Sequence, residues 1–200
     1  MRVNNGAEVH IPLTGILSNT SLGSTTFEFD FKVRNAVDYS KLITYNTIVN
    51  DDGTETVQKT IASDGKGAFL TYYANYKGIM IGTQEAFFSL SEQQVVNARY
   101  TEDERVKISF AIDPNGTEVG GNFSLIYIYV NSVLTGVYPY SKSLEFNGKM
   151  DEIVINSNYC DVDLYNIRVY NSFLNFLNIT QNWVGDASGL TEKINRYNKN

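Results

Sequence analysis

The stretch from Gly148 to Tyr170 reads GKMDEIVINSNYCDVDLYNIRVY, and the fold can be worked out from it. Two β-like runs, Glu152–Asn156 and Val162–Tyr170, flank a polar turn, so we predict a hairpin here. The second run places apolar side chains on one face as far as Leu164 and then shifts phase at Ile167. One extra residue reverses the alternation of side chains along a strand, so this shift predicts a β-bulge.

After this stretch the sequence changes from strand to helix periodicity. Phe173, Leu174, Leu177 and Trp183 recur at helical spacing, and the segment from Ala187 to Tyr197 also has helical character. We therefore expect helix only at the C-terminus. We also expect Trp183 to pack against the strands from an amphipathic helix.

Alternation of apolar and polar residues predicts further strands before this stretch. Phe27–Val33 puts Glu28, Asp30 and Lys32 on the face opposite its apolar residues, and Val106–Ile112 alternates in the same way. The other expected strands are Val9–Leu13, Leu42–Val49, Val57–Ile61, Ala68–Tyr73, Gly78–Gly82, Leu125–Val130 and Val133–Tyr138, while Phe87–Val96 is left open between strand and a short turn of helix. Strands about 10 residues apart, separated by turn residues, indicate an all-β fold. We predict a two-sheet antiparallel β-sandwich with a short C-terminal helical segment.

Length and charge limit the domain organisation and the partners. Two hundred residues suit one domain, which we divide into an N-terminal strand and lead-in (1–24), a sandwich (25–185) and a helical tail or linker (186–200). The chain has 16 basic and 22 acidic residues and a net charge of −6. Nucleic acids and anionic membranes require a basic surface, so neither is an expected partner. No apolar run approaches the roughly 20 residues of a spanning helix, and the N-terminus lacks the apolar region of a signal peptide.

Four motifs in the second half resemble those of laminin-G-like, concanavalin A-like jelly-roll domains. They are VKISFAID (106–113), LIYIYVNSVLTGV (125–137), FNGKMDEIVI (146–155) and VDLYNIRVYN (162–171), followed by Asn182-Trp183. Ser132 stands where the family's Tyr-Val-Asn-Gly hairpin usually has glycine. The resemblance covers roughly residues 25 to 185, and it extends to such domains in bacteriophage or prophage structural proteins of gut bacteria. It implies a sandwich that binds glycans or proteins, often with calcium and usually without chemistry of its own.

Glu28 and Asp30 are the first candidates for catalysis. They lie at i and i+2 on one strand face, roughly 7 Å apart, whereas a retaining glycosidase holds two carboxyls about 5–5.5 Å apart. One glycosidase family with the same fold carries a third carboxylate on this strand as acid/base, and this strand lacks it. A solvated strand face is the simpler interpretation. His10 is the only histidine and Cys160 the only cysteine, which argues against a catalytic triad and against zinc sites. We expect no catalytic residues and no enzymatic activity.

Tyrosines are the best candidates for ligand binding. In the strand Leu125–Val130 the apolar face belongs to the isoleucines, so Tyr127 and Tyr129 point to the opposite face, where we expect them to be exposed. A second cluster comprises Tyr72, Tyr73 and Tyr76. Sugar rings stack their C–H faces on aromatic side chains, so both clusters are candidate glycan sites. The alternative is that they are ordinary strand-face or interface tyrosines.

Calcium is the one metal that the composition permits, because it needs only oxygen ligands. The candidate ligands are Asp151, which the resemblance supports, Asp113, and the turn Asn50–Gly53. The alternative is that these Asp and Asn residues only form turns.

We predict a non-catalytic, carbohydrate-binding (lectin-like) module of a larger extracellular surface or virion protein. Its expected partners are glycans or neighbouring virion or surface subunits, without nucleic acid and without membrane insertion. The alternative is a structural or adhesion domain of a phage tail or capsid-associated protein that makes protein–protein contacts. A glycoside hydrolase on the same fold is the third hypothesis.

Overall fold

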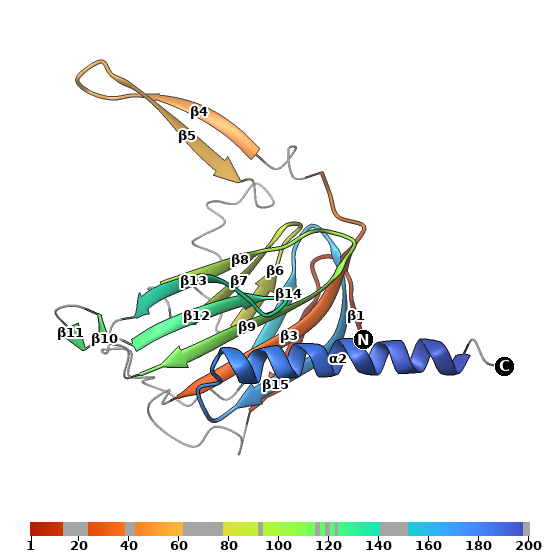
Figure 1. The fold of residues 1–200 in the computed structure, drawn as a ribbon. Helices are drawn as coiled ribbons and strands as arrows, with labels where there is room; N and C mark the ends of the chain where they lie inside the picture. Colours follow the sequence, from red (N-terminus) through yellow and green to blue (C-terminus); the bar gives the residue numbers. More distant parts are fainter. Residues whose placement is uncertain are drawn as a thin grey trace.

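In the computed structural model, two β-sheets stack on each other and one long helix lies across the outer face of the larger sheet (Figure 1). The structure describes residues 1–13, 24–38, 43–61, 78–91, 94–114, 117–118, 121–122, 124–140 and 152–197. The helix, α2, spans Phe176–Tyr197. Among the described residues, no helix combines the length and the apolar character needed to cross a membrane.

The larger sheet has six strands in the order β1-β15-β3-β9-β12-β13, and the smaller sheet has five in the order β2-β14-β6-β7-β8. The larger sheet consists of β1 (Arg2–Val3), β15 (Asp161–Tyr170), β3 (Thr25–Arg34), β9 (Arg105–Asp113), β12 (Ser124–Val130) and β13 (Val133–Tyr140). The smaller sheet consists of β2 (Glu8–Pro12), β14 (Glu152–Ser157), β6 (Gly78–Ile81), β7 (Glu85–Ser91) and β8 (Gln94–Arg99). Neighbours pair antiparallel except β14 with β6, which are parallel. The predicted all-β sandwich is therefore confirmed.

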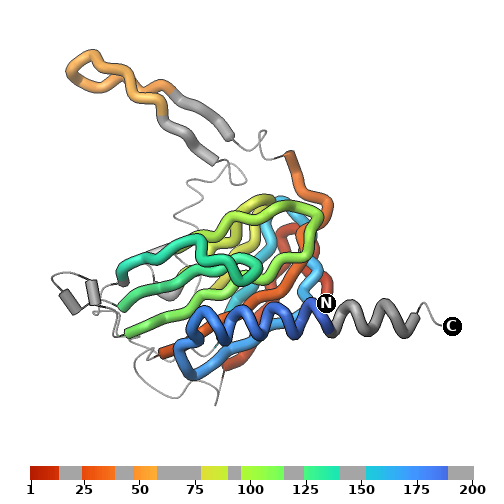
Figure 2. Tube along the Cα trace, viewed as in Figure 1, coloured from red at the N-terminus to blue at the C-terminus, as the bar shows by residue number. Residues whose placement is uncertain are grey.

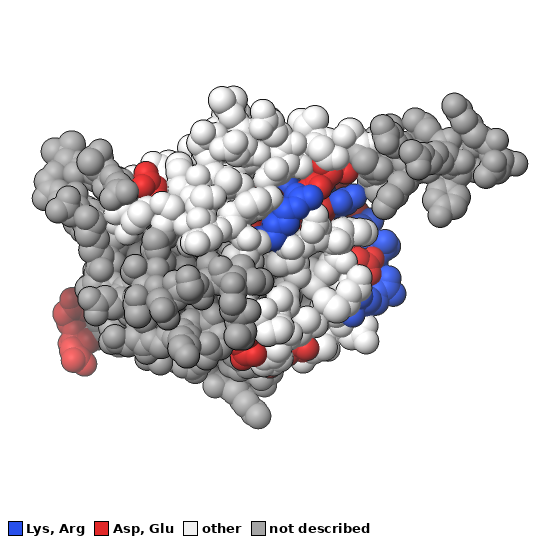
Figure 3. Space-filling model, turned by 90° about the horizontal axis from the view of Figure 1, so that it is seen from below, with Lys and Arg blue, Asp and Glu red and all other residues white. Residues whose placement is uncertain are grey.

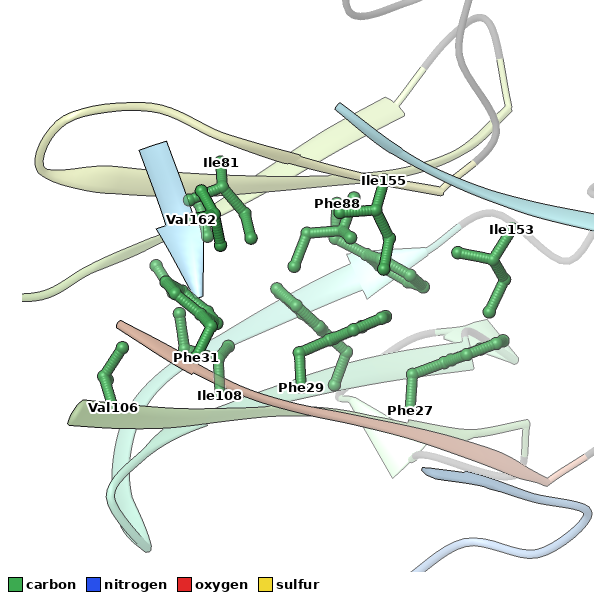
Figure 4. Packing of buried hydrophobic residues seen from close by; sticks show 14 of the residues in the cluster. Phe27, Phe29, Phe31, Ile81, Phe88, Val106, Ile108, Ile153, Ile155 and Val162 are labelled. Carbon is green, nitrogen blue, oxygen red and sulfur yellow. The ribbon is translucent and has the colours of Figure 1, made fainter. Parts of the chain in front are cut away.

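Aromatic side chains fill the space between the sheets (Figure 4). Phe27, Phe29 and Phe31 of β3 point inward and are fully buried. Phe88 from the smaller sheet stacks on Phe110 from the larger, with ring centroids 4.4 Å apart. These five buried aromatic rings stabilise the sandwich, because each large apolar side chain contributes about 1.5–3 kcal/mol on burial. The period-2 pattern of β3 and β9 thus places the core where the sequence predicts it.

The stretch Gly148–Tyr170 is not a hairpin, which corrects the prediction made from it. Its strands β14 and β15 belong to different sheets, so the turn between them carries the chain across the edge of the sandwich. The reason is that Ile155 and Val162 both point into the common core, one from each sheet. The predicted bulge is confirmed, since the pairing of β15 with β3 shifts between Leu164 and Asn166.

Most other strand predictions hold within about two residues, and Phe87–Val96 proves to contain parts of two strands, β7 and β8. The predicted strand Ala68–Tyr73 lies outside the described residues. Two two-stranded ribbons are separate from both of these sheets. One pairs β10 (Thr117–Glu118) with β11 (Gly121–Asn122), and the other pairs β4 (Ile43–Val49) with β5 (Glu55–Ile61). The β4–β5 ribbon lies apart from the sandwich (Figure 2).

The first residues of the chain belong to the sandwich more closely than the division by sequence implies. Strands β1 and β2 pair with β15 and β14, so the first residues extend both sheets. Helix α2 is continuous, and the expected boundary between 185 and 186 falls inside it. Asn175 caps the helix start, because its Oδ1 accepts a hydrogen bond from the backbone N–H of Asn178 at 3.1 Å.

Candidate functional site

The outer face of β3 is covered by α2, although its charges led us to expect a solvated face. Glu28 and Asp30 are only 1% and 2% exposed. Ile179 of α2 is fully buried in a small apolar cluster with Ala111 and Tyr129, and this contact holds the helix on the sheet. The expectation of a solvated face is wrong, because the strand pattern alone does not show that a helix covers its polar side.

Charged side chains fill the seam between α2 and the sheet. The Lys107 ammonium lies 3.0 Å from Glu28 and 2.9 Å from Asp186 of the helix. Arg168 of β15 donates two hydrogen bonds to the Asp186 carboxylate, at 2.7 and 2.6 Å. Burial alone would raise the pKa of Asp186, but the hydrogen bonds from Arg168 and Lys107 outweigh it and lower the pKa. Asp186 therefore stays ionised and ties the helix to two strands.

A small pocket opens beside this network, with a volume of about 160 Å³. Two strands, β3 and β9, the turn after β12 and the helix build it, from Asp30, Arg105, Lys107, Asn131, Trp183, Asp186 and Ala187. Trp183 is partly buried, so it packs against the sandwich and still borders the pocket. Drug-sized ligands occupy about 300–1,000 Å³, so this pocket suits something nearer one sugar ring.

The Asp30–Arg105 pair lies on one side of the pocket. Arg105 donates from Nε to Asp30 at 2.7 Å and from Nη2 to the other carboxylate oxygen. Its guanidinium also lies over the ring of Tyr165, 4.6 Å from the ring centroid. Tyr165 is the extra residue of the bulge in β15 and is 47% exposed. Bulges redirect side chains, so the predicted phase shift places an exposed aromatic ring next to Arg105.

Asn131 connects the pocket to the turn between β12 and β13. Asn131 and Ser132 have φ values of 48° and 66°, the left-handed pair typical of a two-residue type I′ hairpin turn. The Oδ1 of Asn131 accepts the backbone N–H of Lys107 at 2.9 Å, which fixes the side chain at the pocket wall. The turn is thus part of the site as well as of the fold.

The predicted tyrosine sites are placed differently from the expectation. Tyr129 is 4% exposed, and Tyr127 is partly buried with its ring centroid 5.4 Å from that of Phe173. Their expected exposure is wrong for a simple reason: α2 and the segment before it cover this part of the sheet. Burial also raises the pKa of Tyr129. The other cluster, Tyr72, Tyr73 and Tyr76, lies outside the described residues.

The structure gives the calcium prediction no further support. Asp113 is partly buried at the end of β9, and Asp151 lies outside the described residues. In the turn after β4, Asp52 accepts hydrogen bonds from the backbone and hydroxyl of Thr54, as a turn-forming residue does. Within the described ranges, no three His, Cys, Asp or Glu side chains are grouped to hold a metal ion. Calcium remains an untested prediction.

The lone thiol is inert where it lies. Cys160 is 1% exposed, and its Sγ is 3.3 Å from the carbonyl oxygen of Gly82. Burial raises its pKa to about 12, so the thiolate is absent at neutral pH. His10 lies on an exposed strand between two glutamates, Glu8 and Glu152.

Sequence reasoning missed Arg105 and Tyr165 and interpreted Trp183 only as a packing residue. The bulge signal at Ile167 was the one indication of an unusual side chain on β15. Nothing in the sequence of α2 indicated which face of which sheet it covers. The pocket therefore emerges only when β3, β9 and α2 are placed together.

No protein-family model matches the sequence, and no curated protein matches it. Solved structures share its fold. The botulinum neurotoxin serotype G binding domain has a TM-score of 0.57 at 13% identity, over 94% of this chain. A structure described by the dependence of botulinum neurotoxin type C cell entry on two ganglioside molecules has a TM-score of 0.58 at 13% identity, over 92% of this chain. The binding domain of botulinum neurotoxin DC in complex with rat synaptotagmin II has a TM-score of 0.58 at 11% identity, over 92% of this chain.

The chain spans 42% of the length of each of these three structures. At such low identity the likeness establishes the fold alone. It supports a β-sandwich, without singling out the laminin-G-like family or a phage protein.

Proposed function

We propose that the chain is a non-catalytic glycan-binding module of a larger protein exposed outside the cell, and that the sugar binds in the pocket between α2 and the larger sheet. The observation that carries the proposal is the composition of that pocket. It combines the indole of Trp183 with amide, carboxylate and guanidinium groups in a volume of about 160 Å³. A sugar ring needs such a pairing, because its C–H face stacks on an aromatic ring and its hydroxyls need donors and acceptors.

The neurotoxin domains with the same fold support this ligand class, since one is described as depending on gangliosides for cell entry. The pocket replaces Tyr127 and Tyr129 as the proposed site, because those two side chains lie under the helix and its lead-in. Stacking contributes roughly 1 kcal/mol for each aromatic contact, and hydrogen bonds to the sugar hydroxyls add to it. We expect a dissociation constant in the micromolar-to-millimolar range for a single site. Several copies on one surface would raise the apparent affinity through avidity.

Binding without turnover follows from the state of the carboxylates. Glu28 and Asp30 are buried, and each is paired with a cation, Lys107 or Arg105. A general acid must reach the glycosidic oxygen that it protonates. Glu28 lies under α2, and Asp30, which borders the pocket, has both carboxylate oxygens bonded to Arg105, so neither is free to act as a general acid.

The test is titration calorimetry of the whole chain against bacterial, plant and animal polysaccharides. Trp183→Ala removes the stacking surface and should weaken binding about fivefold, which corresponds to roughly 1 kcal/mol, while circular dichroism shows an intact β-sandwich. Tyr138→Ala is the matched control, because Tyr138 is an exposed aromatic residue on β13, the strand at the far edge of the larger sheet. Undiminished binding by the Trp183 variant would contradict the proposed site, and release of reducing sugar would contradict binding without turnover.

A second candidate function, protein–protein contact within a surface or phage tail assembly, is favoured by a separate observation. The β4–β5 ribbon lies apart from the sandwich and exposes Ile48, Val49 and Val57. Strand β13 forms one edge of the larger sheet and exposes Val133 and Leu134. Failure to bind any glycan, together with self-association in sedimentation experiments, would favour this function over the first.

A further inference from the structure

In the arginine ion pairs on the outer face of the larger sheet the carboxylate is the deeper partner, whereas Lys107, 4% exposed, lies deeper than Asp186, 17% exposed. The side chain of Arg105 is 28% exposed and that of Asp30 is 3% exposed. Arg168 is 32% exposed against 1% for Glu28, and Arg34 is 41% exposed against 16% for Asp163. Arg34, Arg105 and Arg168 are therefore more accessible to a ligand than the carboxylates with which they pair.

The exposed arginines on this face contrast with the net charge of the whole chain, which is −6. Lys and Arg side chains gather on one side of the molecule in the view from below, with Asp and Glu among them and also elsewhere (Figure 3). The cations of the outer face, from β1, β3, β9 and β15, are Arg2, Lys32, Arg34, Arg105, Lys107 and Arg168. Of these cations, Arg105 and Lys107 line the pocket, and Arg105 is the more accessible to a ligand, because Lys107 is almost fully buried.

The hydrogen-bond donors and acceptors in the pocket also favour an anionic ligand. Asp30 accepts two hydrogen bonds from Arg105, and Asp186 accepts from both Lys107 and Arg168, so these carboxylates are already engaged. A guanidinium has five N–H donors, and the bonds to Asp30 use two of those of Arg105. Arg105 is thus able to bind a further acceptor, and its planar fork suits a carboxylate.

We propose that the pocket selects acidic saccharides, with the sugar carboxylate bound by Arg105 and the sugar ring placed against Trp183. This inference rests on the proposed glycan-binding function and adds the class of sugar to it. The carboxylate can belong to a uronic acid or to a sialic acid, because both present the same planar group. A neutral sugar has no carboxylate to pair with the remaining N–H donors of Arg105.

The experiment compares sugars that differ only in the acidic group. Calorimetry with the whole chain uses polygalacturonate against its methyl ester, and 3′-sialyllactose against its methyl ester. We expect at least tenfold tighter binding of one acidic member, and we expect the difference to shrink between ~0.05 and ~0.5 M salt as screening increases. Which pair shows the effect separates uronate from sialate.

Variants assign the effect to Arg105. Arg105→Gln combined with Asp30→Asn removes both charges, leaves no unpaired buried carboxylate, and should abolish the acidic preference. Arg105→Lys keeps the positive charge but lacks the planar fork of N–H donors, so it should retain part of the acidic preference. Arg99→Gln is the control, because Arg99 forms an exposed pair with Glu85 on the smaller sheet.

The possible outcomes separate the two proposals. Equal binding of acidic and neutral sugars, lost in the Trp183→Ala variant, would overturn the acidic preference and leave the glycan-binding proposal intact. Acidic preference that survives in the double variant would overturn the role of Arg105. Absence of binding to all four sugars and to every other polysaccharide would refute both.

Discussion

Asp163 shows how a single carboxylate can join three strands. It lies on β15, accepts a hydrogen bond from Arg2 of β1 at 2.8 Å, and also pairs with Arg34 of β3. The hydrogen bonds from Arg2 and Arg34 lower its pKa from the ordinary 3.8 to about 2. The N-terminal strand is therefore tied to the sheet by charge as well as by its short backbone pairing.

The first prediction concerns the pH dependence of this link. The folded protein keeps Asp163 ionised at pH values where the unfolded chain has already bound a proton. Its stabilising effect is thus complete above about pH 4 and is lost as the pH falls toward 2. Asp163→Asn should lower the melting temperature at pH 7. The difference in melting temperature between the variant and wild type should become smaller as the pH falls from 4 to 2.

Thermal melts across this pH range check the prediction. Glu104→Gln serves as the control, because Glu104 is exposed and takes part in none of the described ion pairs. A deficit for Asp163→Asn that is equally large at pH 2 and pH 7 would mean that packing, rather than charge, accounts for the loss.

Single residues also show where the sequence sufficed and where it did not. The sequence located the turn at Asn131-Ser132, and the structure gives both residues the left-handed φ that this turn requires. It located the bulge as well, because a phase shift in alternation has few other causes. It did not reveal that Tyr165 lies beside Arg105, since that contact depends on how β15 and β9 flank β3.

At the scale of elements, α2 determines what the larger sheet can do. Periodicity predicted a helix after residue 170, and the structure confirms it as one element. The pattern of apolar residues shows which side of a helix is buried, but it does not show which surface buries it. For this reason the burial of Glu28 and Tyr129, and the pocket beside Trp183, could not be predicted from the sequence.

The second prediction concerns the link between the helix and the sheet. Asp186→Asn keeps the shape of the side chain and removes the charge that Lys107 and Arg168 share. We expect the free energy of unfolding to fall by about 1–3 kcal/mol, because Lys107 is almost fully buried and loses one of its two carboxylate partners.

Denaturant titration measures this loss, with Arg99→Gln as the matched control. Arg99 is 81% exposed, so its ion pair with Glu85 should contribute less than about 1 kcal/mol. Equal stabilities of the two variants would show that the apolar contact of Ile179 alone holds the helix in place.

At the scale of the whole molecule, the sandwich and the β4–β5 ribbon are separate structures. The alternating pattern predicted strands in both, but it could not show that one pair stands apart. The error at Gly148–Tyr170 has a similar origin. Two consecutive strands look alike in sequence whether they pair with each other or join opposite sheets, because each presents one apolar face to the same core.

The last prediction follows from this separation. Strands β4 and β5 pair only with each other among the described strands, and Ile48, Val49 and Val57 are exposed. Replacing residues 43–61 by a short Gly/Ser linker should therefore leave the unfolding free energy of the sandwich within about 1 kcal/mol of wild type, since none of the described side chains of the ribbon belongs to the core. Phe88→Ala, made as the comparison, should cost about 3–5 kcal/mol because it empties the centre of the core.

Sugar binding should persist in the shortened chain, whereas self-association through the ribbon should disappear. A loss of several kcal/mol on shortening would show that the ribbon packs on the sandwich in solution.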